Sequence, residues 1–187
     1  MKKVRILMAA ITVFILITGC KSISKKAEVI SINGMIYDTQ NRPVVNYTIF
    51  ADGNEMCSSD IGGRFFIKKI EKGEHAFTGR GNGYLNINEN VVINDKEQII
   101  YIRVPSIETK LEEAFSLMKE GRYDKAGECI GEVLEADEGN TDAVFFMSVI
   151  EFLEGNKQQA EEYLLILKEK GGAEKYVPEF EKIISQN

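Results

Sequence analysis

Apolar and polar side chains alternate along the chain from about residue 28 to residue 105. Ile30, Ile32 and Ile36 follow this period of two, and so do the later runs that end at Ile93 and Val104. Clusters of Asp, Asn, Gly and Pro interrupt the runs about every ten residues. Short alternating strands separated by such turns are typical of sheets that bury one face each. The pattern predicts an antiparallel β-sandwich of about seven strands over residues 28–105.

The pattern becomes helical after Pro105. Apolar residues now recur three or four positions apart, first from Leu111 to Met118 and then from Tyr123 to Val133. This spacing places them on one side of a helix. The composition changes at the same point, from a segment rich in Val, Ile, Asn and Gly to one rich in Glu, Lys, Leu and Ala. We therefore expect a multidomain α and β protein, with a boundary at residues 104–106 and a helical domain over residues 107–187.

An internal repeat runs through the helical half. Gly121 and Gly155 are 34 residues apart, and Ala126 and Ala160 keep the same interval. A period of 34 residues with small side chains at fixed positions resembles the tetratricopeptide family. The resemblance implies two hairpins over about residues 107–140 and 141–174, and the apolar residues beyond Pro178 imply a capping helix over about 178–186. An ordinary pair of helical hairpins is the alternative.

Several short segments of the first domain follow one another in a familiar order. They are 34–38 (GMIYD), 42–44 (RPV), 60–65 (DIGGRF), 72–75 (KGEH) and 83–84 (GY). This order resembles the carboxypeptidase regulatory-like family. Two departures are Ser58-Ser59, where that family often has Thr, and His75, where an aromatic or apolar residue is common. The resemblance implies a transthyretin-like (prealbumin-like) sandwich of seven strands. It also implies a non-catalytic module that acts as a spacer, a folding aid or an interaction surface.

The N-terminus has the pattern of a secretory signal. Lys2, Lys3 and Arg5 precede an uncharged stretch from Ile6 to Gly19, which is shorter than the ~20 residues of a spanning helix. The end of the stretch, 17–20 (ITGC), resembles a bacterial lipobox. The resemblance implies removal of residues 1–19, diacylation of Cys20, a tether over residues 20–27 and stable membrane anchoring through palmitate-like chains. An ordinary signal peptide with an incidental cysteine is the alternative.

The net charge of the chain limits the classes of partner that it can bind. The formal net charge is −6, and it becomes −9 when the three cations of the signal segment are removed. Residues 107–187 contain 19 Asp and Glu against 9 Lys and Arg. Nucleic-acid binding requires clustered basic residues, so we expect none. Lys21 stands where Asp would signal inner-membrane retention, which favours the outer membrane or the cell surface.

The sequence offers little catalytic chemistry. His75 is the single histidine, so we expect no multi-histidine metal site, no metal and no cofactor. Residues 60–63 (DIGG) have too few oxygen ligands for calcium, and residues 79–83 (GRGNG) connect strands instead of opening a helix as a phosphate loop does. Cys57 with His75 is a nucleophile and base on paper, but no third residue supports it. We interpret Cys57 and Cys129 as buried small residues, with a disulfide between them as the alternative, and we expect no enzyme.

These observations favour a lipid-anchored protein of the cell envelope that acts as a protein-interaction or assembly module. The alternatives are a glycan- or peptidoglycan-associated binding protein, for which Tyr84 is the candidate aromatic, and an accessory subunit of an envelope enzyme or transport complex. Tetratricopeptide arrays bind partners through the first helix of each hairpin. We therefore expect a partner with a basic segment to contact residues outside the apolar stripes of those helices, namely Lys110, Glu113, Leu117, Glu120, Met147, Glu151 and Glu154.

Overall fold

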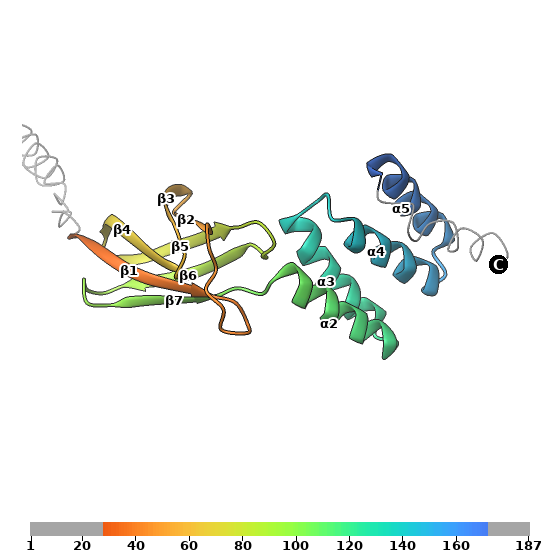
Figure 1. The fold of residues 1–187 in the computed structure, drawn as a ribbon, viewed down its shortest axis with the longest axis horizontal. Coiled ribbons are helices and arrows are strands. Elements are labelled where there is room, and N and C mark those ends of the chain that lie inside the picture. Colours follow the sequence, from red (N-terminus) through yellow and green to blue (C-terminus); the bar gives the residue numbers. More distant parts are fainter. Residues whose placement is uncertain (1–27, 172–187) are drawn as a thin grey trace, which may run out of the picture.

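A computed structural model describes residues 28–171. The described chain forms seven strands in two sheets, followed by four helices (Figure 1). The strands are β1 (Val29–Tyr37), β2 (Thr48–Ala51), β3 (Asn54–Ser58), β4 (Arg64–Glu71), β5 (Gly73–Arg80), β6 (Ile87–Ile93) and β7 (Ile99–Arg103). The helices are α2 (Ile107–Lys119), α3 (Tyr123–Ala136), α4 (Thr141–Leu153) and α5 (Lys157–Lys170).

The two sheets form the predicted β-sandwich, but its strands are not all antiparallel. One sheet has the order β4-β1-β7 and the other has the order β3-β2-β5-β6. β1 runs antiparallel to β4 and parallel to β7, with Met35 opposite Tyr101. The expectation of an antiparallel sandwich is therefore wrong for this pair. Because β7 ends where α2 begins, at the same end of the sandwich as Tyr37, it has to run in the direction of β1.

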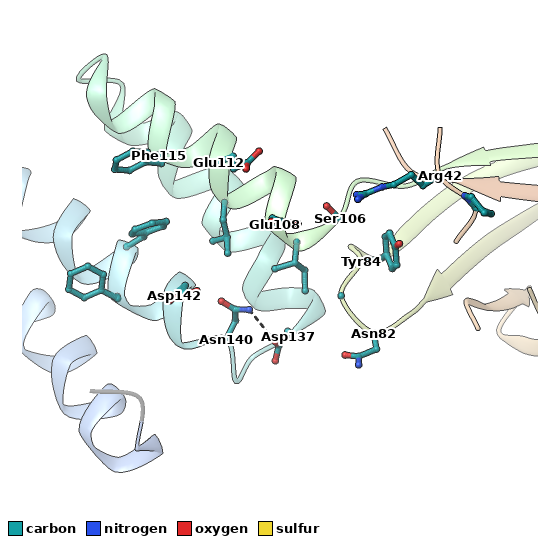
Figure 2. Close-up of a pocket in the computed structure, with 16 residues that line it drawn as sticks. Arg42, Asn82, Tyr84, Ser106, Glu108, Glu112, Phe115, Asp137, Asn140 and Asp142 are labelled. Carbon is teal, nitrogen blue, oxygen red and sulfur yellow. Dashed lines mark hydrogen bonds between the residues drawn. The ribbon is translucent and has the colours of Figure 1, made fainter. Parts of the chain in front are cut away.

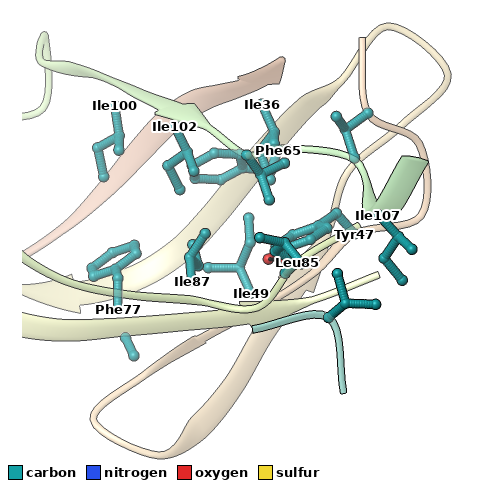
Figure 3. Close-up of a cluster of buried hydrophobic side chains, with 14 of the residues drawn as sticks. Ile36, Tyr47, Ile49, Phe65, Phe77, Leu85, Ile87, Ile100, Ile102 and Ile107 are labelled. Atoms are coloured by element: carbon teal, nitrogen blue, oxygen red, sulfur yellow. Dashed lines mark hydrogen bonds between the residues drawn. The ribbon is translucent and has the colours of Figure 1, made fainter. Parts of the chain in front are cut away.

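The alternating pattern corresponds to burial in the core of the sandwich. Ile32 and Ile36 of β1 are fully buried, and so are Ile49 of β2, Ile67 of β4 and Phe77 of β5. Figure 3 shows these two inward faces meeting, with isoleucines of β7 above and side chains of β5 and β6 below. Burial of apolar surface from both sheets is the main stabilising contribution to this part of the molecule.

Tyr47 is the largest fully buried side chain of the core. Its hydroxyl lies 2.9 Å from the carbonyl oxygen of Gly79 and 2.8 Å from that of Leu85. The ring lies so close to the backbone of β5 that a Cβ atom at Gly79 or Gly81 would clash with it. Gly79 and Gly81 therefore make room for the Tyr47 ring.

Side-chain caps and glycine turns delimit the helices. The Ser106 hydroxyl accepts a hydrogen bond from the backbone N–H of Thr109 at 3.1 Å and begins α2, and Asn140 does the same for α4 through Ala143 at 3.0 Å. Gly121 follows α2 with a φ of 73°, and Gly155 follows α4 with a φ of 88°. Glycine adopts this conformation more readily than residues with a Cβ atom, so the repeated glycines mark the two turns.

The expected arrangement of tetratricopeptide-like hairpins is wrong for the described residues. The described chain has four helices in succession, in which α2 packs on α3, α3 on α4 and α4 on α5, without a clear tetratricopeptide arrangement of hairpins. The 34-residue spacing reports a shared turn and a shared buried alanine, at Ala126 and Ala160. Any antiparallel helix pair that packs closely needs such residues, so the spacing does not specify how the pairs stack. The helix expected at 178–186 lies outside the described residues.

The helices are attached directly to one end of the sandwich. The backbone N–H of Ile107 donates to the carbonyl of Gly83 at 2.9 Å, and the N–H of Leu85 donates to the carbonyl of Pro105 at 3.1 Å. Ile107 is only 8% exposed and belongs to the same buried cluster as the sandwich core. The side chain of Asn86 also donates to the carbonyl of Glu135 in α3 at 3.1 Å. The segment around Pro105 is therefore held on both sides and is not a free linker.

Candidate functional site: a groove between the sandwich and the helices

A groove of about 920 Å³ lies where the helices meet the sandwich. Its floor comes from the attachment segment around Ser106, and its walls come from the loops of the sandwich and from α2, α4 and the α3–α4 turn (Figure 2). It exists because α2 leaves the sandwich at an angle, α3 returns toward the sandwich, and α4 begins there again (Figure 1). The lining residues are Arg42, Pro43, Asn82, Gly83, Tyr84, Ser106, Ile107, Glu108, Leu111, Glu112, Phe115, Asp137, Asn140, Asp142, Phe145 and Phe146.

The sandwich wall presents Tyr84 and Arg42. Tyr84 pairs with Ser106 through a backbone bridge, which holds the Tyr84 backbone beside the start of α2, and its side chain lines the groove. Arg42 is held by the buried carboxylate of Asp38, with the arginine Nε donating to Asp38 Oδ2 at 2.6 Å. Burial alone would raise the pKa of Asp38, but hydrogen bonds from the backbone and side chain of Arg42 and from the Gln40 N–H outweigh it and lower that pKa. The positive charge of Arg42 is therefore already paired.

The helix wall is aromatic. The ring of Phe115 in α2 stacks on the ring of Phe146 in α4, with centroids 6.1 Å apart and an angle of 17° between the planes. The ring of Phe145 lies 6.2 Å from that of Phe146 at 45°. Phe115 is nevertheless 47% exposed, so part of its face is open to the groove side of α2. Such a wall gives a bound side chain apolar surface on which to pack.

Four carboxylates line the same groove. Glu108 and Glu112 lie one turn apart on α2, Asp142 is in the first turn of α4, and Asp137 is in the turn before it (Figure 2). Asp137 accepts hydrogen bonds from Gly139 N–H and from the side chain of Asn140. Among the described residues, no lysine or arginine forms an ion pair with Glu108, Glu112 or Asp142. These three carboxylates are exposed to solvent, and Glu108 interacts electrostatically with the Arg42 guanidinium beyond ion-pair distance.

None of the seven partner-binding residues expected from the sequence lines this groove. Lys110 lies between Glu113 and Glu132, at 3.2 Å from each, and Glu120 pairs with Arg122 at 2.9 Å. Leu117 and Met147 pack against the core, and Glu151 accepts a hydrogen bond from Asn156. Glu154 is exposed at the far end of α4. The seven thus do not gather into one site, and whether any of them contacts a partner stays a prediction.

The groove residues of α2 were not identified from the sequence. The apolar spacing from Leu111 to Met118 predicts a buried side of this helix, whereas Leu111 and Phe115 both line the groove. The available signal was the row Glu108, Leu111, Glu112 and Phe115, which shares one face of α2 by its three- and four-residue spacing. That row mixes acidic and apolar side chains, as an open groove does and a packed interface does not.

The other candidate residues are separate from the groove. Cys57 and Cys129 are free thiols, so the alternative of a disulfide between them is wrong. Burial raises the pKa of the Cys57 thiol, and the His75 ring is hydrogen-bonded to Asp52 and to the carbonyl of Glu71. Within residues 28–171, no group of three His, Cys, Asp or Glu side chains could hold a metal ion, and no helix combines the length and hydrophobicity to cross a membrane. Cys20 lies outside the described residues.

Comparison with known proteins adds little to these observations. No family model and no curated protein matches the chain. Similar solved structures include a chain of a type II cohesin–X-dockerin complex from Acetivibrio cellulolyticus, at 17% identity and a TM-score of 0.37, covering 48% of this chain and 72% of that one. A streptococcal ancillary pilin has 16% identity, a TM-score of 0.34 and coverages of 43% and 30%, and the major pilin subunit of Bacillus cereus has 12%, 0.34, 42% and 29%. At these scores the likeness carries no argument about function, and the β-sandwich rests on the two sheets themselves.

Proposed function

We propose that this protein is a non-catalytic lipoprotein of the cell envelope and that its groove holds a segment of a partner protein. The sandwich, which resembles a carboxypeptidase regulatory-like module, serves in this account as the support that presents the groove. Lipid on Cys20 anchors the chain, and Lys21 after it favours the outer membrane or the cell surface. The division into residues 28–105 and 107–187 is part of the same proposal.

The observation that carries this proposal is the combination of aromatic and charged surface in one open groove. A volume of about 920 Å³ is at the upper end of what a small-molecule site occupies, so it accommodates several side chains of a peptide. Aromatic side chains are enriched at the centres of protein interfaces, because their rings bury much surface at a small entropic cost. Phe115 and Tyr84 supply such rings from opposite walls.

The position of the groove also supports the proposal. Val29 begins β1 at the end of the sandwich away from the helices, and Tyr37 ends it beside the attachment segment (Figure 1). The nine residues of β1 span roughly 30 Å at the rise of an extended strand. A lipid eight residues before the described chain would therefore leave the groove about that distance beyond the anchored end. A partner in solution or on a neighbouring surface could reach it there.

A glycan is the second candidate, and Tyr84 favours it. Aromatic rings stack on sugar faces, and Tyr84 is the aromatic residue that a sandwich turn contributes to the groove. Carboxylates such as Glu112 could accept hydrogen bonds from hydroxyl groups. Because both candidates use the same groove, a variant that blocks it tests both, and the identity of the released ligand distinguishes them.

The test is a pair of matched tryptophan variants. Asn82 is exposed at the edge of the groove, and Asn94 is exposed at the opposite end of the sandwich, in the β6–β7 loop. We expect Asn82→Trp to abolish co-purification of a partner that is cross-linked to the wild type in the native envelope, because the indole fills the groove. We expect Asn94→Trp to leave it unchanged. Equal recovery with both variants would contradict a groove site.

A further inference from the structure

We propose that the occupant of the groove is a protein segment in which a lysine or arginine is flanked by apolar side chains. This inference rests on the proposed function, since it assigns a chemistry to the segment that the groove would hold. Its basis is the pairing of an uncompensated negative rim with an aromatic wall.

The charges that face the groove are negative on balance. Four carboxylates line it against one guanidinium, and that guanidinium, on Arg42, already pairs with the buried Asp38. The N-termini of α2 and α4 also lie at the groove, and each contributes roughly half a positive charge. Glu108 and Asp142, in the first turns of these helices, offset that contribution. A cation entering the groove is therefore attracted to at least one carboxylate without a competing partner.

The two faces of α2 show how the protein treats its own charges. On the face toward α3, Lys110 pairs with both Glu113 and Glu132 at 3.2 Å. On the groove face, Glu108 and Glu112 have no lysine or arginine within ion-pair distance among the described residues. The acidic side chains on the α3 side of this helix thus form ion pairs within the protein, whereas those on the groove side do not. A ligand cation supplies the charge that the groove face lacks.

The aromatic wall favours a cation with apolar neighbours. The Lys119 ammonium lies 4.7 Å from the centroid of the Phe115 ring, so a cation from a ligand would displace Lys119 from this ring or share the ring with it. Glu112 precedes Phe115 by three positions, which places a carboxylate beside the same ring. A lysine or arginine stem can pack on the ring while its charged end reaches the carboxylate. Apolar neighbours in the segment would then cover Leu111 and Phe146.

An anionic segment is the opposite possibility, because helix N-termini commonly bind anions. Here each of the two helix starts already has its own acid in the first turn, and each is capped by a side chain, Ser106 or Asn140. An incoming phosphate or carboxylate would meet Glu108 and Asp142 first. The groove therefore discriminates against anions.

The experiment first selects peptide ligands from a random library and then tests whether their binding depends on the carboxylates of the groove. A phage library of random 12-residue peptides is panned on the full chain in detergent, and the selected peptides are synthesised. Their affinities are measured for the wild type and for Asn82→Trp, which blocks the groove. They are also measured for a groove-neutral variant (Glu108→Gln, Glu112→Gln, Asp142→Asn). The control has the same loss of charge at exposed positions away from the groove (Glu128→Gln, Glu161→Gln, Asp124→Asn). Circular dichroism and melting temperature verify that each variant is folded.

We expect peptides enriched in Lys or Arg beside apolar residues, with binding abolished by Asn82→Trp. The groove-neutral variant should bind these peptides roughly tenfold more weakly at low salt, because three individually weak ion pairs are lost. The difference in affinity should be smaller at about 0.5 M salt, which screens exposed charges more strongly than physiological salt does. The control should bind as the wild type does. Peptides without basic enrichment that need an open groove but ignore its charges would overturn this inference and leave the groove site standing. No binders, or binders indifferent to Asn82→Trp, would overturn the proposed function itself.

Discussion

The Nδ1 atom of His75 lies 2.6 Å from the Oδ2 atom of Asp52, and its Nε2 atom lies 2.8 Å from the carbonyl oxygen of Glu71. Both partners are acceptors, so both ring nitrogens must carry a proton for the two hydrogen bonds to form together. Asp52 is in the β2–β3 turn, and its other carboxylate oxygen accepts from the N–H of Ala76 in β5. The imidazolium form of His75 thus ties this turn to β5.

This arrangement predicts a stability that depends on pH. Burial alone would lower the pKa of His75, but hydrogen bonds to Asp52 and Glu71 outweigh it and raise the pKa above 6.5. The stabilisation is therefore complete below pH 6.5 and is lost as the pH rises through the raised pKa. The hydrogen bond from His75, followed by that from Ala76, lowers the pKa of Asp52 below 3.8, so its contribution is lost only as the pH falls through that lowered value.

The test compares the melting temperatures of the wild type and of His75→Gln from about pH 5 to about pH 8.5, because a histidine titrates within this range. We expect the wild type to lose its advantage over the variant as the pH rises, because His75 is the single histidine and glutamine does not titrate. A difference between the two proteins that is constant across this range would show that the imidazolium does not stabilise the fold.

The second prediction concerns the buried hydroxyl of Tyr47. Tyr47→Phe keeps the ring but removes the donor that serves the carbonyls of Gly79 and Leu85. We expect the free energy of unfolding in urea to fall by about 1–3 kcal/mol, the cost of leaving buried acceptors unsatisfied. Tyr101 is 68% exposed and serves as the control, since Tyr101→Phe should change the free energy little. Equal effects of the two substitutions would contradict the assigned role of Tyr47.

The third prediction concerns the attachment of the helices to the sandwich. Ile107 begins α2 and is buried in the cluster that continues into the sandwich core. We expect Ile107→Ala to lower the free energy of unfolding by about 2–5 kcal/mol, because it opens a cavity. The same change at Ile61, which is 86% exposed, should have almost no effect. A loss confined to the helical signal in circular dichroism, with the sandwich unchanged, would indicate that the two parts are not coupled through Ile107.

The fourth prediction concerns the anchor. Cys20→Ser should release the protein from membranes or leave its signal peptide uncleaved, because the acyl chains on Cys20 supply the membrane affinity. Metabolic labelling with a radioactive fatty acid should mark the wild type and not the variant. An unlabelled wild type would contradict the proposal that Cys20 is lipidated, but it would not bear on the proposed groove site.

Local patterns predicted the local structure well. The alternation through Ile32 and Ile36 corresponds to burial in a sandwich, and the glycines at 121 and 155 mark helix turns. The direction of β7 relative to β1 was not predictable, because side chains alternate in the same way in parallel and antiparallel strands. The stacking of the helices was likewise not encoded in a 34-residue spacing that any close helix pair satisfies.

The groove could not be predicted from the sequence for a different reason. Its walls come from Arg42 and Tyr84 on one side and from Phe115 and Asp142 on the other, which are far apart in the chain. Their proximity depends on the angle at which α2 leaves the sandwich. Contacts at this junction join residues far apart in the sequence, such as the hydrogen bond of 3.0 Å from the Gln40 side chain to the Thr109 hydroxyl. No periodicity reports a contact of this kind.

The most direct measurement of the central claim places a photoreactive residue in the groove. Phe115 and Phe66 are both 47% exposed, and Phe66 is in β4, which contributes nothing to the groove. Benzoylphenylalanine replaces each in turn, and the cells are irradiated with the envelope intact. The account predicts a discrete adduct from position 115 that Asn82→Trp abolishes, and none from position 66. An adduct from position 66 without one from position 115, or no adduct from either, would contradict it.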